Sequence, residues 1–524
     1  MSSESPVPDG VETDVLVVGA GPTGLMLANW LARYGVDVMV VDRKSGPTRE
    51  SRALGVQART MEIYDQLGVV DQVRAEAQEA SVLVPGFEKR LFSPIPVGRL
   101  GSGLTPYPRI YILEQSSNER ILYEHLRSQG RDVLWDHGLL SLDDSSPADP
   151  AGRCVTAVVS SPGEEAFTIR ARYCVGADGG SSVVRKLRGI PFVGSTNAHV
   201  FFVSDARGVR GLVPGGINLR FGDTDFLLTF PMGADHDRLL GVVPIDDETA
   251  ERDIVEEVVR RRVERFFGVV YRDSAWFATY RVHHRVAERF RDGPFFLAGD
   301  AAHVHSPVGA QGMNTGLQDA HNLAFRLADV ILHGAEESTL DRYEAERRPI
   351  AEWLVATTDR VFGVVTSGTS AARFFRRWVL PAVAPIATST VPRVRGANRL
   401  FQYVSQIRIH YWMSTAEHER GVRDPVIGRR LSWVPRADGS NFDALREPVW
   451  QVHEYGSVDP AVVRSVRETL GLPTHVYRAA PTTPLRPGVF YLVRPDGFVA
   501  AEARAADVPA VFAPLVPPRA AVPS

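Results

Sequence analysis

The sequence is poor in cysteine, with only Cys154 and Cys174 among 524 residues. Two thiols are too few for a disulfide framework or a cysteine-rich metal cluster, and they are typical of a reducing compartment. We therefore expect both to be apolar, inert thiols and the protein to be cytoplasmic. The polar and acidic first ten residues agree with that expectation, because they lack the basic and apolar regions of a signal peptide.

Long apolar runs and an excess of one charge are also absent. No stretch approaches the roughly 18 consecutive apolar residues that a membrane span requires, so we expect none. The 59 Lys and Arg residues nearly balance the 62 Asp and Glu residues, which leaves a net charge of −3. Without a basic excess, a nucleic-acid partner is not expected. The length and the 44% hydrophobic content predict a globular protein of several domains.

The N-terminal region carries the pattern of a dinucleotide-binding β-α-β unit. An apolar run at 14–18 predicts a buried strand, and a glycine-rich turn at 19–24 follows directly. Apolar residues at three- and four-residue steps then predict a helix that ends at Gly35. A second predicted strand at 36–41 ends in Asp42, 21 residues after the middle glycine of the turn. Dinucleotide-binding units place an acidic residue about 20 residues after the turn.

Each glycine of this turn has an expected task. Gly19 permits the tight turn, Gly21 lets the backbone approach a pyrophosphate, and Gly24 lets the helix pack against the strand. The helix N-terminus attracts the phosphates, and Asp42 accepts hydrogen bonds from a ribose. The motif by itself does not distinguish NAD from FAD, and a chance glycine-rich turn is the alternative. The predicted cofactor-binding residues here are Gly19, Ala20, Gly21, Pro22, Thr23, Gly24, Asp42 and Arg43.

Two later segments repeat the order of an apolar strand and an acidic turn. The first, at 173–185, contains Asp178, and the second, at 295–303, contains Asp300. A glycine-rich segment at 307–316 follows and leads into a long predicted helix whose apolar residues recur at three- and four-residue steps.

Together these motifs resemble those of the single-component, class A FAD-dependent aromatic hydroxylases. That family includes para-hydroxybenzoate hydroxylase, phenol hydroxylases and the hydroxylases of aromatic polyketide pathways. The resemblance extends from about residue 14 to 353 and rests on the glycine turn, Asp178-Gly179, Gly299-Asp300 and the segment 312–316. Within the family, the segments 50–55 and 59–62 are most similar to hydroxylases of anthracycline and angucycline pathways.

The resemblance implies roles for further residues. Asp300 would bind ribityl or ribose hydroxyls of FAD, since a carboxylate accepts two neighbouring O–H groups, and a helix N-cap is its alternative role. The helix start at 312–314 would face the pyrimidine edge of the flavin, where donors stabilise negative charge. Purely structural roles stay open for the polar and loop positions. The further predicted cofactor contacts are Arg52, Gln115, Asp178, Pro307, Gly309, Gly312, Met313 and Asn314.

Several signatures of other chemistries are missing. No second GxGxxG follows a strand, so a separate nicotinamide domain is not expected. The segment 266–276 nearly matches a Baeyer-Villiger fingerprint but has Arg272 where that pattern needs histidine. His303 and His305 lie beside Asp300 without a third ligand at suitable spacing, so we predict structural histidines and no metal site.

The resemblance also implies a reaction. FAD reduced by NAD(P)H would react with dioxygen to a C4a-hydroperoxide, which transfers one oxygen to an electron-rich aromatic ring. The expected small-molecule substrate is a polycyclic phenol of polyketide type. Because the cofactor supplies the reactive group, no side-chain nucleophile is required, and we assign no catalytic residue. The alternatives are a related flavin oxygenase for ring expansion, Baeyer-Villiger chemistry or antibiotic inactivation, and an FAD protein that binds a planar ligand without turnover.

The expected architecture is α/β: a Rossmann-like FAD-binding domain with an inserted antiparallel substrate-binding sheet, a helical connection and a C-terminal thioredoxin-like domain. The last resembles its family in the segment 488–499, two strands joined by a Pro-Asp-Gly turn. It lacks a CxxC motif, so it would serve structure or a subunit interface, which is compatible with a homodimer. The expected boundaries are 1–185 for the first part of the FAD domain (with 80–110 contributing to the substrate domain), 186–285 for the substrate sheet, 286–360 for the second part of the FAD domain, 361–424 for the connection and 425–524 for the thioredoxin-like domain.

Overall fold

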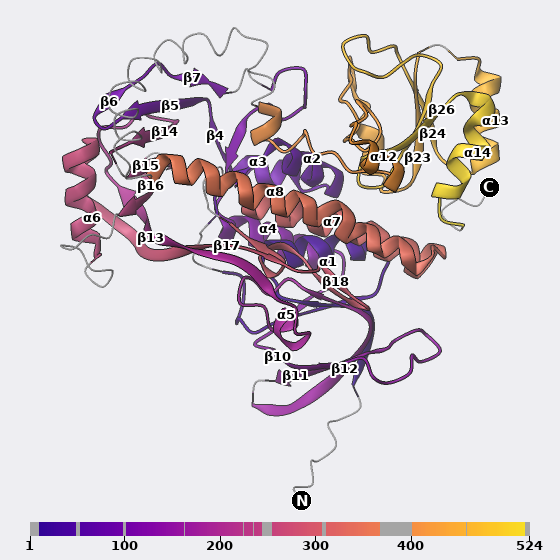
Figure 1. Cartoon of the computed structure of the whole chain (residues 1–524), viewed down its shortest axis with the longest axis horizontal. Coiled ribbons are helices and arrows are strands. Elements are labelled where there is room, and N and C mark those ends of the chain that lie inside the picture. Colours follow the sequence, from indigo (N-terminus) through magenta and orange to yellow (C-terminus); the bar gives the residue numbers. More distant parts are fainter. Residues whose placement is uncertain are drawn as a thin grey trace, which may run out of the picture.

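The computed structural model describes residues 10–48, 53–97, 101–161, 163–223, 225–233, 235–243, 254–305, 311–366, 401–456 and 458–518. Their elements form a Rossmann-like core, a second large sheet and a C-terminal unit (Figure 1). Across these described ranges, no helix combines the length and the apolar character needed to cross a membrane.

The core sheet has a parallel centre, as its apolar strands predict. Strand β1 (Val11–Val18) pairs in parallel with β2 (Val38–Asp42) on one side and with β12 (Glu164–Gly176) on the other. Parallel sheets need cover on both faces, which explains why the central parts of these strands, 15–18, 38–41 and 173–175, are apolar. The remaining strands are β9 (Val133–Trp135) beside β2, β19 (Phe295–Leu297) beside β12, β18 (Arg291–Asp292) beside β19, and the antiparallel β11 (Val155–Ser161) and β10 (Leu139–Asp143).

Helix α1 (Pro22–Tyr34) connects β1 to β2 and packs against α4 (Gln115–Ser128) and α7 (Gly312–His333). It ends where expected, because Gly35 adopts φ +84° and returns its N–H to the carbonyls of the last turn. The expected Rossmann-like α/β core is thus confirmed. The other helices of this part are α2 (Ala58–Leu67), α3 (Val70–Glu76), α5 (Val183–Leu187) and α8 (Asp341–Thr366).

The second sheet is almost entirely antiparallel and has two differently covered faces. Phe201, Phe230 and Leu240 lie in a cluster that faces the core, whereas Phe202 and Leu239 pack with α6 (Glu256–Arg262) and the π-helical turn Val263–Phe267 on the other face. This alternation is the period of two expected of strands. In spatial order the strands are β20 (His303–Val304), β17 (Asp273–Ala287), β13 (Phe192–Arg207), β16 (His236–Val243), β15 (Phe226–Gly233), β14 (Gly216–Phe221), β5 (Val82–Phe87) and β6 (Arg90–Leu91), with β7 (Ile95–Pro96) beside β5.

The segment 80–110 divides between two sheets. Strand β5 joins the second sheet through a parallel pairing with β14. By contrast, β8 (Ile110–Ile112) pairs with β3 (Gly55–Val56) and β4 (Gln78–Ala80) in a small sheet of its own. Strand β17 ends at Ala287, two residues beyond the expected sheet boundary at 285.

The C-terminal unit is a four-stranded sheet with helices. Strand β23 (Gln451–Tyr455) leads through α13 (Pro460–Leu470) to the parallel β24 (Thr474–Tyr477), and β25 (Phe490–Val493) and β26 (Val499–Ala503) follow as an antiparallel hairpin. The spatial order β24-β23-β25-β26 is that of a thioredoxin-like unit. Helix α14 (Val508–Phe512) follows β26, and the hairpin of β21 (Pro435–Arg436) and β22 (Gly439–Ser440) precedes β23. Of the connection expected at 361–424, α8 extends to Thr366, residues 367–400 lie outside the described part, and α12 covers Thr415–Arg420.

In Figure 1 the C-terminal unit forms a lobe on the side of α7 and α8 away from α6 and the second sheet. A buried carboxyl, Asp329, lies where α7 meets this lobe, and Trp450 Nε1 donates to its Oδ2 at 3.1 Å. Burial raises the pKa of Asp329 to about 7, against the Trp450 hydrogen bond and the charges of Arg326 and Arg494. The folded state therefore holds this proton more tightly than the unfolded chain, and stability should fall as the pH rises toward 7.

Asp329→Asn removes this titration while keeping the side-chain shape. Between pH 5 and pH 8, the wild type should lose about 2–3 kcal/mol in free energy of unfolding that the variant does not lose. Urea denaturation at both pH values measures the difference. The exposed Asp507, changed to Asn, is the matched control and should follow the wild-type profile. Parallel profiles for Asp329→Asn and the wild type would contradict the prediction.

Candidate active site

A cavity of about 740 Å³ lies between the core sheet and the second sheet. Its volume falls in the range of ligand pockets, about 300–1,000 Å³. One wall comes from the loops after the core strands, including the glycine turn at 19–24, and the other from strands β15, β16 and β17. The predicted residues that line it are Gly19, Gly21, Pro22, Thr23, Asp42, Arg43, Gln115, Asp178, Asp300, Gly312 and Met313.

The three glycines of the turn have three different environments. Gly19 adopts φ +107°, and a Cβ there would lie 2.5 Å from the carbonyl oxygen of Ala177. A Cβ on Gly24 would lie 1.8 Å from the carbonyl oxygen of Gly19, so α1 packs too closely for any other residue. A Cβ on Gly21 would meet no described atom within 4 Å. The open side of Gly21 faces the cavity, as a backbone that receives a ligand requires.

Asp42 fastens the end of β2 to the turn. Its Oδ2 accepts the N–H of Ala20 at 2.6 Å, and its Oδ1 accepts the N–H of Lys44 at 2.8 Å. Ala20, a predicted site residue, is buried, and its contact with the site is this hydrogen bond to Asp42. A carboxylate offers about four acceptor positions, so Asp42 keeps capacity for a ligand hydroxyl.

Two long helices open onto the cavity at their N-termini. Gly21 and Pro22 begin α1, and Gln311 and Gly312 begin α7. Neither helix has an acidic residue in its first turn, and neither N-cap residue, Gly21 or Gln311, makes a side-chain capping hydrogen bond to a described residue. The partial positive charges of both helix ends therefore face the cavity without an acidic residue in the first turn to offset them, which is an arrangement that favours anions.

Two carboxylates complete this wall. Asp178 Oδ2 accepts the N–H of Val183 at 2.6 Å, while its buried Oδ1 has no hydrogen-bond partner among the described residues. Burial raises the pKa of Asp178, against the hydrogen bonds from Ser182 and the start of α5. Asp300 is exposed toward the cavity in the short 3-10 turn Gly299–Ala301.

The sequence matches the protein family described as FAD binding domain over residues 12–358. The chain belongs to this family. FAD is therefore the cofactor, which decides between the two dinucleotides that the glycine turn left open. The residues present fit it: two uncapped helix N-termini suit a pyrophosphate and an electron-rich flavin, Gly21 leaves space, and Asp178 has an unused acceptor.

Relatives of this flavoprotein are monooxygenases. The 6-methylpretetramide 4-monooxygenase of Streptomyces rimosus is 32% identical over 94% of this chain and 91% of its own length. The rifampicin monooxygenase of Streptomyces venezuelae is 34% identical over 83% of this chain and 85% of its own. The solved structure of the anhydrotetracycline hydroxylase OxyS from Streptomyces rimosus superposes with a TM-score of 0.75 at 28% identity, covering 98% of this chain and all of that one. The expected membership of the FAD-dependent aromatic monooxygenases is confirmed.

The opposite wall of the flavoprotein's cavity is largely apolar and aromatic. Phe230 of β15, Leu240 of β16 and Val282 of β17 line it, and Tyr280 stacks on Phe201 with ring centroids 5.8 Å apart. Arg238 also lines the cavity, in a buried ion pair with Asp205 across strands β16 and β13. No local pattern in the sequence indicates that Arg238 faces the cavity, because its pairing with Asp205 depends on the register of the two strands.

A polar cluster at one end of the cavity was not predicted. Glu119 is fully buried and accepts Gln115 Nε2 at 2.9 Å, Lys44 Nζ at 3.3 Å and the N–H of Thr48 at 2.8 Å. Gln115 thus lines the cavity with its amide oriented by a buried carboxylate. Glu119 follows Gln115 by one helical turn, but nothing in the sequence indicates that β2 brings Lys44 to it.

The side chain of Asn314 does not line the flavoprotein's cavity. Its Oδ1 accepts the N–H of Gln57 at 2.8 Å and the hydroxyl of Thr60 at 2.7 Å, and its Nδ2 donates to the carbonyl of Gly55 at 2.8 Å. It therefore ties α7 to β3 and α2. Met313, next to it, does line the cavity.

The remaining predictions divide into histidines and undescribed residues. His303 Nε2 lies 2.7 Å from Asp319 Oδ2, which gives this histidine a structural partner. Among the described residues, no group of three or more His, Cys, Asp or Glu side chains is arranged to hold a metal ion. Arg52, Pro307 and Gly309 lie outside the described residues.

Proposed function

We propose that this flavoprotein uses NAD(P)H and dioxygen to hydroxylate a polycyclic aromatic substrate of the phenolic polyketide type. The observation that carries the proposal is a single cavity with two unlike walls. One wall presents two helix N-termini and several carboxylates, and the other presents Phe230, Leu240 and Tyr280. A charged cofactor and a flat apolar substrate can therefore lie against each other in the same enclosure.

We assign the cofactor wall as follows. The N-terminus of α1 and the backbone at Gly21 hold the pyrophosphate, Asp42 accepts ribose hydroxyls, and Asp300 accepts hydroxyls of the ribityl or ribose. Backbone donors at 312–314 stabilise negative charge on the pyrimidine edge. Bound FAD would supply the redox chemistry, with NAD(P)H as the electron source and dioxygen as the oxygen source. The other predicted contacts, including Arg43, Gln115 and Asp178, complete the set.

The second wall positions the aromatic ring and excludes water. Phe230, Leu240 and Val282 are nearly fully buried, and their strands present them to one face of the sheet. Apolar and aromatic walls favour a planar hydrocarbon framework, and water exclusion limits loss of the reactive oxygen species. Arg238 is balanced by Asp205, so the wall carries no unpaired charge at this point.

The proposal is tested by substrate-dependent NAD(P)H oxidation with a panel of anthraquinones, angucyclinones and simple phenols. A polycyclic phenol should accelerate oxidation and gain one atom of ¹⁸O from labelled dioxygen. Insertion of that oxygen into a C–C bond would instead identify a ring-expanding oxygenase. If the protein is yellow but no aromatic compound accelerates its NAD(P)H oxidation, the proposal is contradicted. That result would support the alternative of a flavoprotein that binds a ligand without turnover.

Asp300→Ala should purify largely without yellow colour. The loss of a charged acceptor for cofactor hydroxyls predicts an FAD affinity about 10- to 100-fold weaker. Absorbance at 450 nm relative to 280 nm measures occupancy, and FAD titration measures affinity. Asp300→Asn is the matched control, because its amide keeps one acceptor oxygen and should give an intermediate loss. Full occupancy in Asp300→Ala would refute the assigned contact.

A further inference from the structure

Asp319, on α7, lies behind the Gly299-Asp300 turn and is fully buried. Its Oδ2 accepts the N–H of Gly299 at 3.1 Å and contacts His303 Nε2 at 2.7 Å. Gly299 adopts φ +61° and packs directly on Thr23 of the glycine turn. One carboxylate oxygen thus fixes the backbone that immediately precedes Asp300.

The other oxygen of Asp319 accepts Arg347 Nε at 2.6 Å. Arg347, on α8, is also fully buried, and its guanidinium makes two further hydrogen bonds. Nη2 donates to the carbonyl of Thr315 in the first turn of α7 at 3.1 Å, and Nη1 donates to the hydroxyl of Tyr411 at 2.8 Å. Arg347 is therefore connected by hydrogen bonds to two parts of the cofactor wall. It is connected to the Asp300 turn through Asp319, and it bonds the first turn of α7 directly at Thr315.

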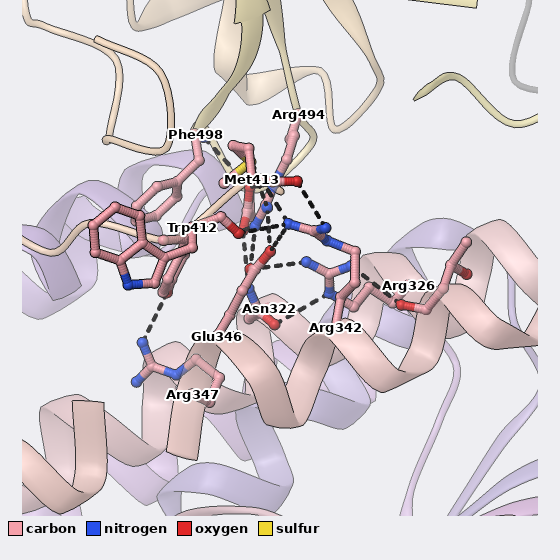
Figure 2. Close-up of polar contacts among 12 residues, drawn as sticks. Asn322, Arg326, Arg342, Glu346, Arg347, Trp412, Met413, Arg494 and Phe498 are labelled. Carbon is pink, nitrogen blue, oxygen red and sulfur yellow. Dashed lines mark hydrogen bonds and ion pairs between the residues drawn. The ribbon is translucent and has the colours of Figure 1, made fainter. Parts of the chain in front are cut away.

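Tyr411 connects this arginine to the C-terminal unit. It belongs to the segment 401–413, which precedes that unit, and its ring lies on Phe498 with centroids 4.3 Å apart. Its N–H donates to the carbonyl of Gly428 at 2.7 Å. The guanidinium carbon of Arg494 lies near both rings, 5.5 Å from the centroid of Tyr411 and 5.6 Å from that of Phe498. Figure 2 shows Arg347 beside the cluster in which Arg494 meets α8.

We propose that Arg347 is a positioning residue for the FAD site, and that through Tyr411 it makes FAD retention depend on the docked C-terminal unit. The inference rests on the proposed contact between Asp300 and FAD. Without Arg347, the buried charge of Asp319 is left partly uncompensated, so the carboxylate shifts and the backbone of Gly299 shifts with it. A hydrogen bond to a charged group is strong enough to hold such a turn.

The charge balance at Asp319 supports this role. Burial alone would raise the pKa of Asp319, but Arg347 and His303 outweigh it and lower the pKa. Asp319 therefore stays an acceptor toward Gly299, as the positioning role requires. The guanidinium fork makes three directional contacts at once, which a lysine cannot reproduce.

The experiment measures FAD dissociation constants and flavin absorption spectra for full-length Tyr411→Phe, Arg347→Lys and Arg347→Met. Tyr411→Phe keeps the ring on Phe498 and removes one hydroxyl, so it should fold normally and bind FAD about 3- to 10-fold more weakly. Arg347→Met should lose more, and Arg347→Lys should recover part of that loss. Arg348→Met is the matched control on the same helix, because Arg348 is partly exposed and pairs with Glu344 and Glu352.

A double-mutant cycle separates positioning from general stability. If Tyr411 acts through the Asp300 turn, its effect on the FAD dissociation constant should shrink to less than about two-fold in the Asp300→Asn background. An undiminished effect there, or wild-type affinity in both Tyr411→Phe and Arg347→Met, would overturn the inference. A wild-type protein that binds no FAD would instead overturn the proposed function, and this is seen without any variant.

Discussion

Gly21→Val should give a folded protein that purifies without flavin. Gly21 has φ −79° and ψ −177°, an extended conformation that valine adopts readily, and no described atom lies within 4 Å of its Cβ position. The valine side chain would occupy the space in front of the α1 N-terminus, where a pyrophosphate must approach the backbone N–H groups. We expect at least about a 100-fold loss of FAD affinity with the melting temperature of the apoprotein unchanged.

Substitutions at two other glycines test whether FAD is lost because the site is blocked or because the fold is damaged. Gly233 also has open space at its Cβ position but lies at the end of β15 and does not line the cavity, so Gly233→Val should retain FAD. Gly24→Ala should lose both FAD and stability, because its Cβ would lie 1.8 Å from the carbonyl oxygen of Gly19. Visible absorbance, FAD titration and thermal unfolding report the three outcomes. Normal FAD occupancy in Gly21→Val would show that the pyrophosphate does not lie there.

Glu346→Gln should be the most destabilising of the substitutions considered. Glu346 is 3% exposed on α8 and receives Arg494 from the C-terminal unit at 2.9 and 3.0 Å, Arg326 at 2.8 Å and Arg342 at 3.2 Å (Figure 2). Asn322 Nδ2 donates to the same carboxylate at 2.9 Å. Removing one member of a buried ionic cluster leaves the others uncompensated, and the expected loss is about 3–5 kcal/mol in free energy of unfolding.

The pH dependence of this cluster has a definite sign. Burial alone would raise the pKa of Glu346, but Arg326 and Arg494 outweigh it and hold the pKa well below the usual range. A lowered pKa in the folded state contributes stability above the ordinary carboxylate value, and that stability is lost as the pH falls. Glu346→Gln should therefore flatten the acid limb of the wild-type stability profile.

Urea denaturation at pH 7 and at lower pH checks both statements. Glu352→Gln is the control on the same helix, because Glu352 is half exposed and pairs only at the surface with Arg348. It should change stability by less than about 1 kcal/mol. Equal denaturation midpoints for Glu346→Gln and Glu352→Gln would mean that the cluster does not hold the C-terminal unit to α8.

The features that could be predicted from the sequence are short in range. The turn at 19–24, the helix ending at Gly35 and the strand ending at Asp42 follow from glycine positions and apolar periodicity within about thirty residues, and the structure contains all three. Their exact limits differ, since β1 begins at Val11 and β2 at Val38, because pairing with β12 and with each other decides where strands start.

The contacts that could not be predicted join residues far apart in the sequence. Asp319 bonds Arg347 of the next helix and the turn at Gly299, and Tyr411 reaches the same arginine from beyond residue 400. Asn314 is a predicted cofactor contact whose side chain has a different role. Its side-chain oxygen accepts hydrogen bonds from Gln57 and Thr60 instead. Such pairings depend on how whole elements pack, for which no local pattern exists.

The spaced glycine and aspartate residues determined by themselves that the chain contains a dinucleotide-binding β-α-β unit, because nucleotide binding by such a unit is encoded in local backbone geometry. That the nucleotide is FAD and the chemistry that of a monooxygenase was implied only by the resemblance of the motifs to a known family. Only the tertiary structure decided which side chains meet in the cavity, and that the C-terminal unit is fastened to α8 through Glu346 and Arg494. The physical reason is that buried charges are stable only beside their partners, and those partners are brought together by folding rather than by sequence proximity.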